Sequence, residues 1–316
     1  MKITYSAPAK VILSGEHAVV YGKPALVSAI DLRLKFTLTT IERSTNGGNN
    51  FESISTIAKN VKSHLKKQKI KFVDRNFNYQ ITSNIPVRRG LGSSAALSIA
   101  GTAAFLDFYT GKEYSKEIIN NIGYQSEKHF HINASGVDPT TSCFGGLIFY
   151  RKEFEFLKTI SALNFKIPKK FEDNLYLIDS GKSTETSAYL IHNVVGGLFN
   201  KKPQFVEEVL NDIEKVTKRI VVSIIKEDED FFVKSIIDNE ILLEMLGIVS
   251  LRTKKLLKEL ESFGFGKVTG AGGFQEGSGF IVFYTKKSKQ LENYCEKKKM
   301  DFIKFKPSYE GVKREL

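Results

Sequence analysis

The chain has 316 residues, of which 41% are hydrophobic and 26% are charged, and it carries a formal net charge of +12. These values are ordinary for a globular protein. No apolar run approaches the roughly 20 residues that cross a bilayer, so we expect no membrane association. The cysteines Cys143 and Cys295 are too few for a disulfide framework, and the N-terminus lacks a secretion-signal pattern. We therefore expect a cytoplasmic protein.

The positive charge has three interpretations. Lys and Arg outnumber Asp and Glu by 47 to 35, which is compatible with nucleic-acid binding, with attraction for anionic substrates, or with a lysine-coated surface. The densest basic runs, residues 66–71 and 296–299, are short and carry no interleaved aromatic residues. This pattern favours a solvated surface, with anionic substrates second, and we expect no nucleic-acid partner.

The first half of the chain mixes strand and helix patterns. Apolar residues alternate with polar ones from Leu32 to Leu38 and again from Phe77 to Ile81, which predicts strands with one buried face. The alanine-rich segment from Ser94 to Phe108 is apolar on nearly all sides, which predicts a buried helix that ends at Gly111. A further helix is expected over residues 115–128, capped by its first residue.

The second half begins near Asn174 and also mixes both patterns. The expected elements are a strand at 175–178, helices at 205–220, 231–245 and 251–260, and a strand at 280–284. Because strands and helices do not alternate strictly, we expect an α+β protein rather than a doubly wound sheet. We expect two domains, at residues 1–170 and 171–316.

A glycine- and serine-rich loop lies between a strand-like stretch and the buried helix. Its glycines allow close approach of the backbone to a ligand, and the helix start offers N–H donors and the positive end of the helix dipole. A tight turn with Ser93 as the helix cap explains the loop nearly as well. The candidate phosphate-binding residues are Arg89, Gly90, Leu91, Gly92, Ser93, Ser94 and Ala95.

Other polar residues are compatible with phosphate chemistry, although each also has a structural explanation. Lys10 offers a point charge for phosphate at the start of a short predicted strand, from Lys10 to Leu13. Glu127, near the end of a predicted helix, is by itself best explained as a solvated residue. Asp138 is followed by Pro139, which predicts a helix start with Asp138 as the N-cap.

Taken together, these segments resemble the family of galactokinases, homoserine kinases, mevalonate kinases and phosphomevalonate kinases, the GHMP kinases. Residues 86–95 resemble the central motif of the family, and residues 267–273 resemble the third. Residues 6–26 resemble the first motif in its mevalonate kinase version, through Gly15, Glu16 and His17. The resemblance implies an N-terminal domain like ribosomal S5 domain 2, a ferredoxin-like C-terminal domain, and an active site in the cleft between them.

The resemblance also implies roles for individual residues. The glycine loop would hold the phosphates of ATP, Ser94 and Glu127 would bind Mg²⁺, and Asp138 would be the catalytic aspartate beside Lys10. For Thr184 and Thr186, a turn with a Ser or Thr N-cap is an equally good explanation. The implied substrate contacts are Glu16, His17, Thr184, Thr186, Gly270, Ala271 and Gly272.

The function implied is transfer of a phosphoryl group from ATP to the primary hydroxyl of mevalonate, by a homodimer that uses Mg²⁺. Phosphomevalonate as the acceptor, or mevalonate phosphorylated at its 3-hydroxyl, is the nearest alternative. A basic S5-like RNA-binding protein is an alternative of another class. Residues 274–279 depart from the family pattern, and Glu276 would bring negative charge near the phosphates if it pointed inward.

Overall fold

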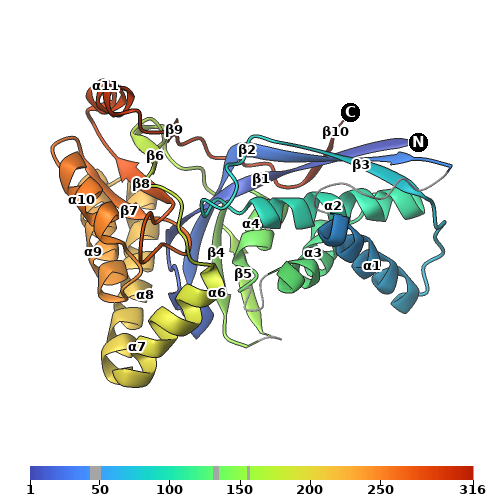
Figure 1. Ribbon diagram of the computed structural model, residues 1–316, viewed down its shortest axis with the longest axis horizontal. Helices are drawn as coiled ribbons and strands as arrows, with labels where there is room; N and C mark the ends of the chain where they lie inside the picture. Colours follow the sequence, from blue (N-terminus) through green and yellow to red (C-terminus); the bar gives the residue numbers. More distant parts are fainter. Residues whose placement is uncertain (43–50, 131–134, 155–156, 316) are drawn as a thin grey trace.

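The computed structural model describes residues 1–42, 51–130, 135–154 and 157–315, and it arranges them around two β-sheets (Figure 1). The first sheet has the strand order β10-β1-β2-β4-β5, with β3 paired to β2, and the second has the order β7-β8-β6-β9. This mixed architecture confirms the predicted α+β class. The strands of the first sheet are β1 (Lys2–Ser14), β2 (Ala25–Thr40), β3 (Phe77–Ser83), β4 (Leu147–Lys152), β5 (Lys158–Ala162) and β10 (Lys313–Glu315).

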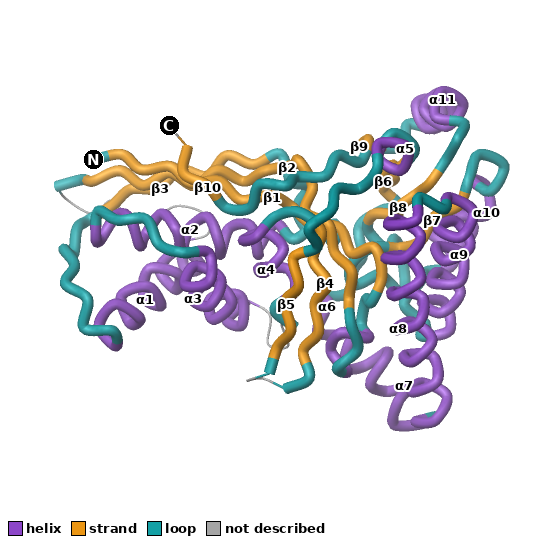
Figure 2. Tube along the Cα trace, turned by 180° about the vertical axis from the view of Figure 1, so that it is seen from behind, coloured by secondary structure: helices purple, strands orange, loops and turns teal. Residues whose placement is uncertain are grey.

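The long antiparallel pair β1 and β2 forms the centre of the first sheet, and helices cover one of its faces (Figures 1 and 2). In β2, Leu34, Phe36 and Leu38 are buried, as their alternation predicted. A short 3₁₀ helix, η1 (Ala18–Tyr21), follows β1. The covering helices are α1 (Phe51–Lys67), α2 (Ser93–Thr110), α3 (Lys116–Phe130) and α4 (Val137–Phe144).

Helix α2 confirms the predicted buried helix. It is buried along most of its length, since its small residues let the sheet and the neighbouring helices approach closely. It ends at Gly111, which adopts the left-handed conformation with φ +70° that glycine accepts without strain. Because α2 begins directly after the glycine-rich loop, its burial gives that loop a rigid support.

The second sheet has the antiparallel strand order of a ferredoxin-like domain. All the strands and helices predicted for the second half of the chain are present. Its strands are β6 (Leu175–Asp179), β7 (Phe265–Val268), β8 (Phe280–Tyr284) and β9 (Phe302–Lys304). The helical segments of this half are α5 (Lys169–Glu172), α6 (Ser187–Tyr189), the π-helix η2 (Leu190–Val195), α7 (Gly196–Lys201), α8 (Pro203–Lys226), α9 (Glu229–Met245), α10 (Leu251–Leu260) and α11 (Ser288–Lys298).

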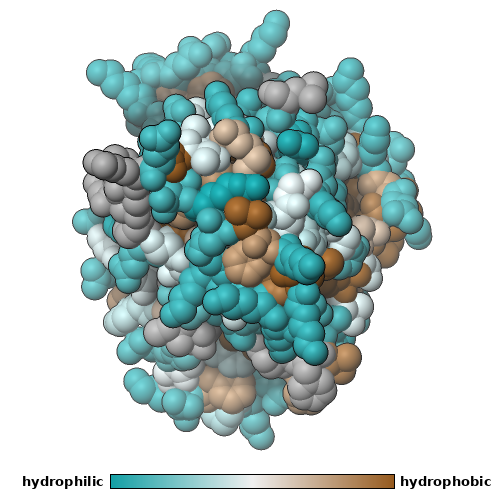
Figure 3. All heavy atoms as spheres, turned by 90° about the vertical axis from the view of Figure 1, so that its right-hand side faces the viewer, coloured by the Kyte–Doolittle hydropathy of each residue, from teal (hydrophilic) through white to brown (hydrophobic). Residues whose placement is uncertain are grey.

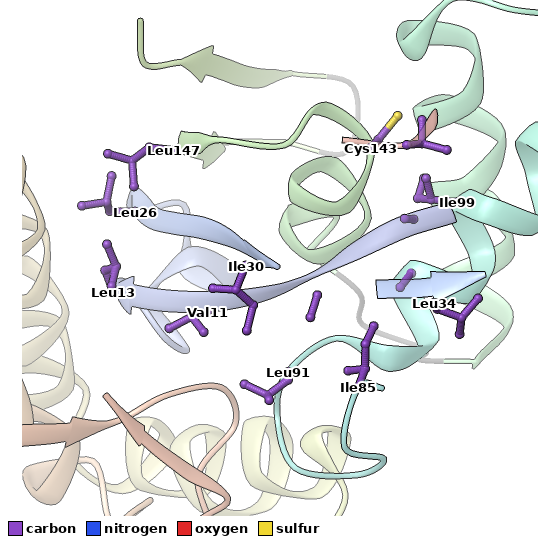
Figure 4. Packing of buried hydrophobic residues seen from close by; sticks show 14 of the residues in the cluster. Val11, Leu13, Leu26, Ile30, Leu34, Ile85, Leu91, Ile99, Cys143 and Leu147 are labelled. Atoms are coloured by element: carbon purple, nitrogen blue, oxygen red, sulfur yellow. The ribbon is translucent and has the colours of Figure 1, made fainter. Parts of the chain in front are cut away.

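The two halves share one continuous hydrophobic core. Val11 of β1, Leu91 of the glycine loop and Val268 of β7 belong to the same buried cluster. Figure 4 shows Leu91 and Ile85 beside the strand that carries Val11. The chain also crosses back at its end, because β10 pairs with β1 and brings the C-terminus near the N-terminus (Figure 1). The functional motifs therefore sit on a rigid junction between the sheets.

Among the described residues, no helix combines the length and the apolar character needed to span a bilayer. The end of the molecule formed by α1, α3 and the N-terminal strands is mostly hydrophilic, with scattered apolar side chains (Figure 3).

Candidate active site

The glycine-rich loop is pinned to β1 and leads directly into α2. The amide of Lys10 donates to the carbonyl of Leu91 at 3.0 Å, and the Leu91 side chain is 1% exposed. Gly92 is the N-cap of α2, so no side chain of its own caps the first turn. Ser93 is therefore the first helical residue and not the cap. The start of a long buried helix at an exposed loop has the geometry of an anion site.

Two glycines of the loop are needed for close packing. Gly92 has φ +76°, and a Cβ atom there would lie 2.9 Å from Cγ of Lys10. Gly90 has φ +84° and faces Gly270 of the third glycine motif, where a Cβ atom would lie 3.0 Å from Cα of Gly90. The loop thus contacts the Lys10 side chain on one side and the third motif on the other.

Lys10 and Asp138 form an ion pair next to this loop. Nζ of Lys10 lies 3.2 Å from Oδ1 of Asp138, with side chains 3% and 33% exposed. The prediction that Asp138 caps a helix is wrong. Gly136 is the N-cap of α4, with φ +94°, and Asp138 lies in the first helical turn. Gly136 accepts this left-handed conformation without strain, and a Cβ atom there would lie 2.8 Å from Oη of Tyr150.

Glu127 of α3 faces the start of α2. Its Oε1 accepts a hydrogen bond from Ser94 at 2.8 Å, and its Oε2 accepts one from Ser98 at 3.0 Å. The glutamate is 3% exposed, so it is not the solvated helix residue that its sequence context alone would favour. Oxygen ligands of this kind suit Mg²⁺, which is commonly held by one or two carboxylates together with substrate phosphates and water.

The described residues contain no group of three or more His, Cys, Asp or Glu side chains that could hold a metal by themselves. A magnesium ion at Glu127 and Ser94 would therefore take its remaining ligands from the nucleotide phosphates and water. The donor set fits a nucleotide-associated ion.

The third glycine motif is joined to the first motif by polar contacts. The hydroxyl of Thr269 accepts from the amide of Ile12 at 2.9 Å and donates to the carbonyl of Ile12 at 3.0 Å. His17 Nε2 lies 2.9 Å from the carbonyl of Ala271. Glu16 forms an ion pair with Lys267, and both side chains are completely buried. Residues more than 250 positions apart in the sequence thus form one junction.

The environment of His17 defines its protonation. Burial lowers the pKa of the imidazole, so the ring is neutral near pH 7. A carbonyl only accepts hydrogen bonds, so Nε2 carries the hydrogen and Nδ1 carries the lone pair. Nδ1 is buried and has no hydrogen-bond partner among the described residues. The backbone of His17 is also unusual, with φ 58° and ψ −44°. Such backbone strain is found most often at functional sites.

Arg89 pairs with the second sheet. Its guanidinium lies 2.9 Å from Oδ1 of Asp179, at the end of β6. The same carboxylate oxygen accepts the amide of Gly181 at 2.8 Å. Burial raises the pKa of Asp179, and the nearby guanidinium of Arg89 opposes that shift. Sequence reasoning did not select Asp179 or Lys267, although Lys267 is the first residue of the recognised third motif.

The segment predicted to border the substrate lies against the altered turn after Gly273. Thr184 is exposed, and Thr186 is the N-cap of α6, with its hydroxyl accepting the amide of Tyr189 at 3.2 Å. The amide of Gln275 donates to Glu185 at 2.9 Å. Glu276 is exposed, so the turn does not bury its charge.

Comparison with known proteins agrees with this arrangement. The family model described as GHMP kinases N terminal domain matches residues 53–146. The mevalonate kinase of Pyrococcus furiosus is 32% identical over 307 residues, covering 86% of this chain and 87% of the relative. The mevalonate kinase of Archaeoglobus fulgidus is 31% identical over 319 residues, covering 98% and 99%.

A solved structure supports the fold. The mevalonate kinase of Methanococcus jannaschii aligns with a TM-score of 0.76 at 24% identity, over 97% of this chain and 98% of that one. The fold, the glycine loop and the sequence relatives together define the class, and the chain belongs to the GHMP kinases. Its relatives within that class, named above, are archaeal mevalonate kinases.

Proposed function

We propose that this protein transfers the γ-phosphoryl group of ATP to the primary hydroxyl of mevalonate. The observation that carries the proposal is the Lys10–Asp138 ion pair beside the start of α2, together with the hydrogen bond from Ser94, in the first turn of α2, to Glu127 of α3. A phosphate-binding helix start, a cation, a carboxylate and a carboxylate-hydroxyl pair for the metal are the parts that phosphoryl transfer requires.

In this proposal the acceptor hydroxyl lies beside Asp138. The hydroxyl oxygen forms a bond to the γ-phosphorus, the bond from that phosphorus to the bridging oxygen breaks, and ADP leaves. The proton of the hydroxyl passes to the Asp138 carboxylate late in the reaction, because the transition state is loose. Lys10 has three N–H donors, and Asp138 is its charged partner among the described residues, so its remaining donors would stabilise the negative charge on the transferred group.

The proposed phosphate contacts are the amides and hydroxyls at the start of α2, together with the backbone of residues 89–92. Ser94 and Glu127 would hold Mg²⁺, which neutralises phosphate charge when it is bound. Arg89 would act on the loop through Asp179, because its guanidinium is engaged there at 2.9 Å.

The proposed acceptor site faces the first and third motifs. His17 would line this site with its ring, whose Nδ1 is a buried hydrogen-bond acceptor and whose Nε2 bonds the Ala271 carbonyl. Thr184, Ala271 and the backbone of Gly270 and Gly272 are further proposed contacts, and Thr186 would shape the site as the cap of α6. Glu16 is 1% exposed, so it would act from behind this surface.

The test is a coupled assay of ADP release with ATP, Mg²⁺ and a panel of acceptors: mevalonate, phosphomevalonate, homoserine and galactose. We expect turnover with mevalonate. Proton-coupled ³¹P NMR of the product distinguishes a primary phosphate ester, which couples to two methylene protons, from a tertiary one. Turnover only with another acceptor, or a tertiary ester, would assign a different reaction, and salt-sensitive RNA binding without ADP release would favour the RNA-binding alternative.

Asp138→Asn tests the catalytic assignment. The amide cannot accept the proton, so kcat should fall by about 10²- to 10⁴-fold. Near wild-type turnover in the folded variant would contradict both the base and the positioning roles.

The homodimer and the cytoplasmic location are further parts of the proposal. Light scattering of the purified protein tests whether it is a homodimer.

A further inference from the structure

Three ionisable side chains lie completely or almost completely buried where the first motif, β7 and α9 meet. They are Glu16, Lys267 and Glu240, and we call them the junction cluster. Lys267 is 0% exposed, Glu16 is 1% exposed and Glu240 is 7% exposed. Lys267 pairs with Glu16 and also donates to the carbonyl of Val268 at 2.7 Å. Glu240, from α9, accepts the amide of Val268 at 2.8 Å.

The cluster is poorly explained as a source of stability. Removing two charges from water costs several kcal/mol per ion, and well-packed apolar residues often replace a buried pair without loss of stability. Here the cost is higher still, because Oε2 of Glu16 and Oε1 of Glu240 are buried without a hydrogen-bond partner among the described residues. The arrangement therefore suggests a requirement for geometry.

The cluster lies where the first and third motifs meet. Glu16 stands between Gly15 and His17 of the first motif, and Lys267 starts the third motif. Two residues after Lys267, the Thr269 hydroxyl bonds to both backbone groups of Ile12. The next residue is Gly270, whose backbone packs against Gly90 of the phosphate loop so closely that a Cβ atom would lie 3.0 Å from its Cα.

The contact between Gly270 and Gly90 is made by two glycines, so no side chain on either residue can adjust to a movement. A shift of Lys267 relative to β1 would therefore pass through residues 268–270 to the backbone of the phosphate loop. The hydrogen bond within this ion pair depends on direction and distance, whereas an apolar contact tolerates sliding.

We propose that Lys267 is a positioning residue for ATP: its ion pair with Glu16 sets the position of the third glycine motif against the phosphate loop. The proposal rests on the proposed function only in that the loop binds a nucleotide. Lys267 touches no substrate in this arrangement. It acts through Gly270 and Gly90.

The test separates nucleotide geometry from stability. Lys267→Met leaves Glu16 as an unpaired buried charge and should lower the melting temperature. The double variant Lys267→Met/Glu16→Met removes both charges, and its melting temperature should return toward that of the wild type. We expect its affinity for ATP, measured by calorimetry without any acceptor, to stay at least about tenfold weaker, because small misplacements of binding groups are costly.

The matched control is Lys254→Met. Lys254 pairs with Glu244 at 2.9 Å in the same half of the molecule, but both side chains are 35% exposed. Loss of such a pair should change neither the melting temperature nor the affinity for ATP noticeably. ATP affinity within twofold of the wild type in the folded double variant would overturn the proposal and leave the pair a purely structural one.

If the double variant does not fold, Glu16→Gln provides the second measurement, since it removes the charge and keeps the shape. Weakened ATP affinity in the folded variant supports the proposal, and unchanged affinity overturns it. Calorimetry without an acceptor also separates this inference from the proposed function. Wild-type protein that binds ATP but does not phosphorylate mevalonate would refute the function alone, and wild-type protein that binds no ATP would refute both.

Discussion

Gly92 offers the sharpest test of the site, because the structure specifies both the strain and the steric contact that a methyl group would introduce. In Gly92→Ala the residue would keep φ +76°, a conformation that costs an L-residue about 1–2 kcal/mol. The new Cβ atom would lie 2.9 Å from Cγ and 3.2 Å from Cε of Lys10. Carbon atoms prefer separations of about 3.5–4.0 Å, so Lys10 must retreat by about half an ångström or more.

The retreat would affect catalysis because Lys10 has little room. Its side chain is 3% exposed, and its Nζ lies 3.2 Å from Asp138. Displacement of a catalytic group by about 1 Å can cost about 100-fold in rate, so we expect kcat to fall by about 10- to 100-fold. The loss should appear in the ADP-release assay at temperatures where the variant is fully folded.

Gly111→Ala is the matched control at the other end of α2. Gly111 has φ +70°, and no atom lies within 4 Å of a Cβ placed there. This variant carries the same kind of backbone strain without the contact to Lys10, so it should lose about 1 kcal/mol of stability and keep its kcat. If Gly92→Ala and Gly111→Ala lose stability equally and both retain wild-type kcat, the assignment of Lys10 to catalysis is wrong.

Three further predictions concern charge, metal and packing. Burial raises the pKa of Glu240 from 4.5 to about 7, against the opposing effects of the Val268 amide and Lys267. Between these pH values the unfolded chain has lost the proton that the folded protein keeps, so the free energy of unfolding falls as pH rises, by about 3 kcal/mol in total. Glu240→Gln should therefore be more stable than the wild type at pH 8 but not at pH 4.5. Chemical denaturation at both pH values measures this, and an equal difference in the free energy of unfolding between variant and wild type at the two pH values would refute the reasoning. Glu127→Gln should raise the Mg²⁺ concentration that gives half-maximal activity by about tenfold, whereas an unchanged magnesium titration would remove Glu127 from the metal site. Gly277→Ala should lower the melting temperature strongly, because its Cβ would lie 2.2 Å from the Gly181 carbonyl carbon, and a variant that melts with the wild type would show that the turn can move aside.

Local sequence patterns were sufficient for most of the elements that position the site. Helix α2 follows from an alanine-rich segment between two glycines, and the strand pattern at Leu34, Phe36 and Leu38 follows from alternation. These features depend on residues near one another in the chain, whose propensities and periodicity are readable directly. Helix α1 was not predicted, although its buried residues from Ile54 to Leu65 recur at helical spacing.

Other features required the tertiary structure. Asp138 lies in a helical turn because Gly136 is the helix cap, at a position where Tyr150 of β4 leaves no room for a Cβ atom. Strand β10 has only three residues, and its pairing with β1 joins positions about 300 residues apart, for which no local pattern exists.

The sequence by itself determined the glycine loop and the helix that follows it, because short-range backbone preferences produce both. It also supplied the charged residues that lie near the loop. The choice of partner for each charged side chain was decided only by the tertiary structure. Arg89 pairs with Asp179, Glu16 with Lys267 and Lys10 with Asp138. An isolated lysine or glutamate is compatible with many partners. Where both partners are fully buried, as Glu16 and Lys267 are, water is removed as an alternative and only the partner that the fold brings within reach remains.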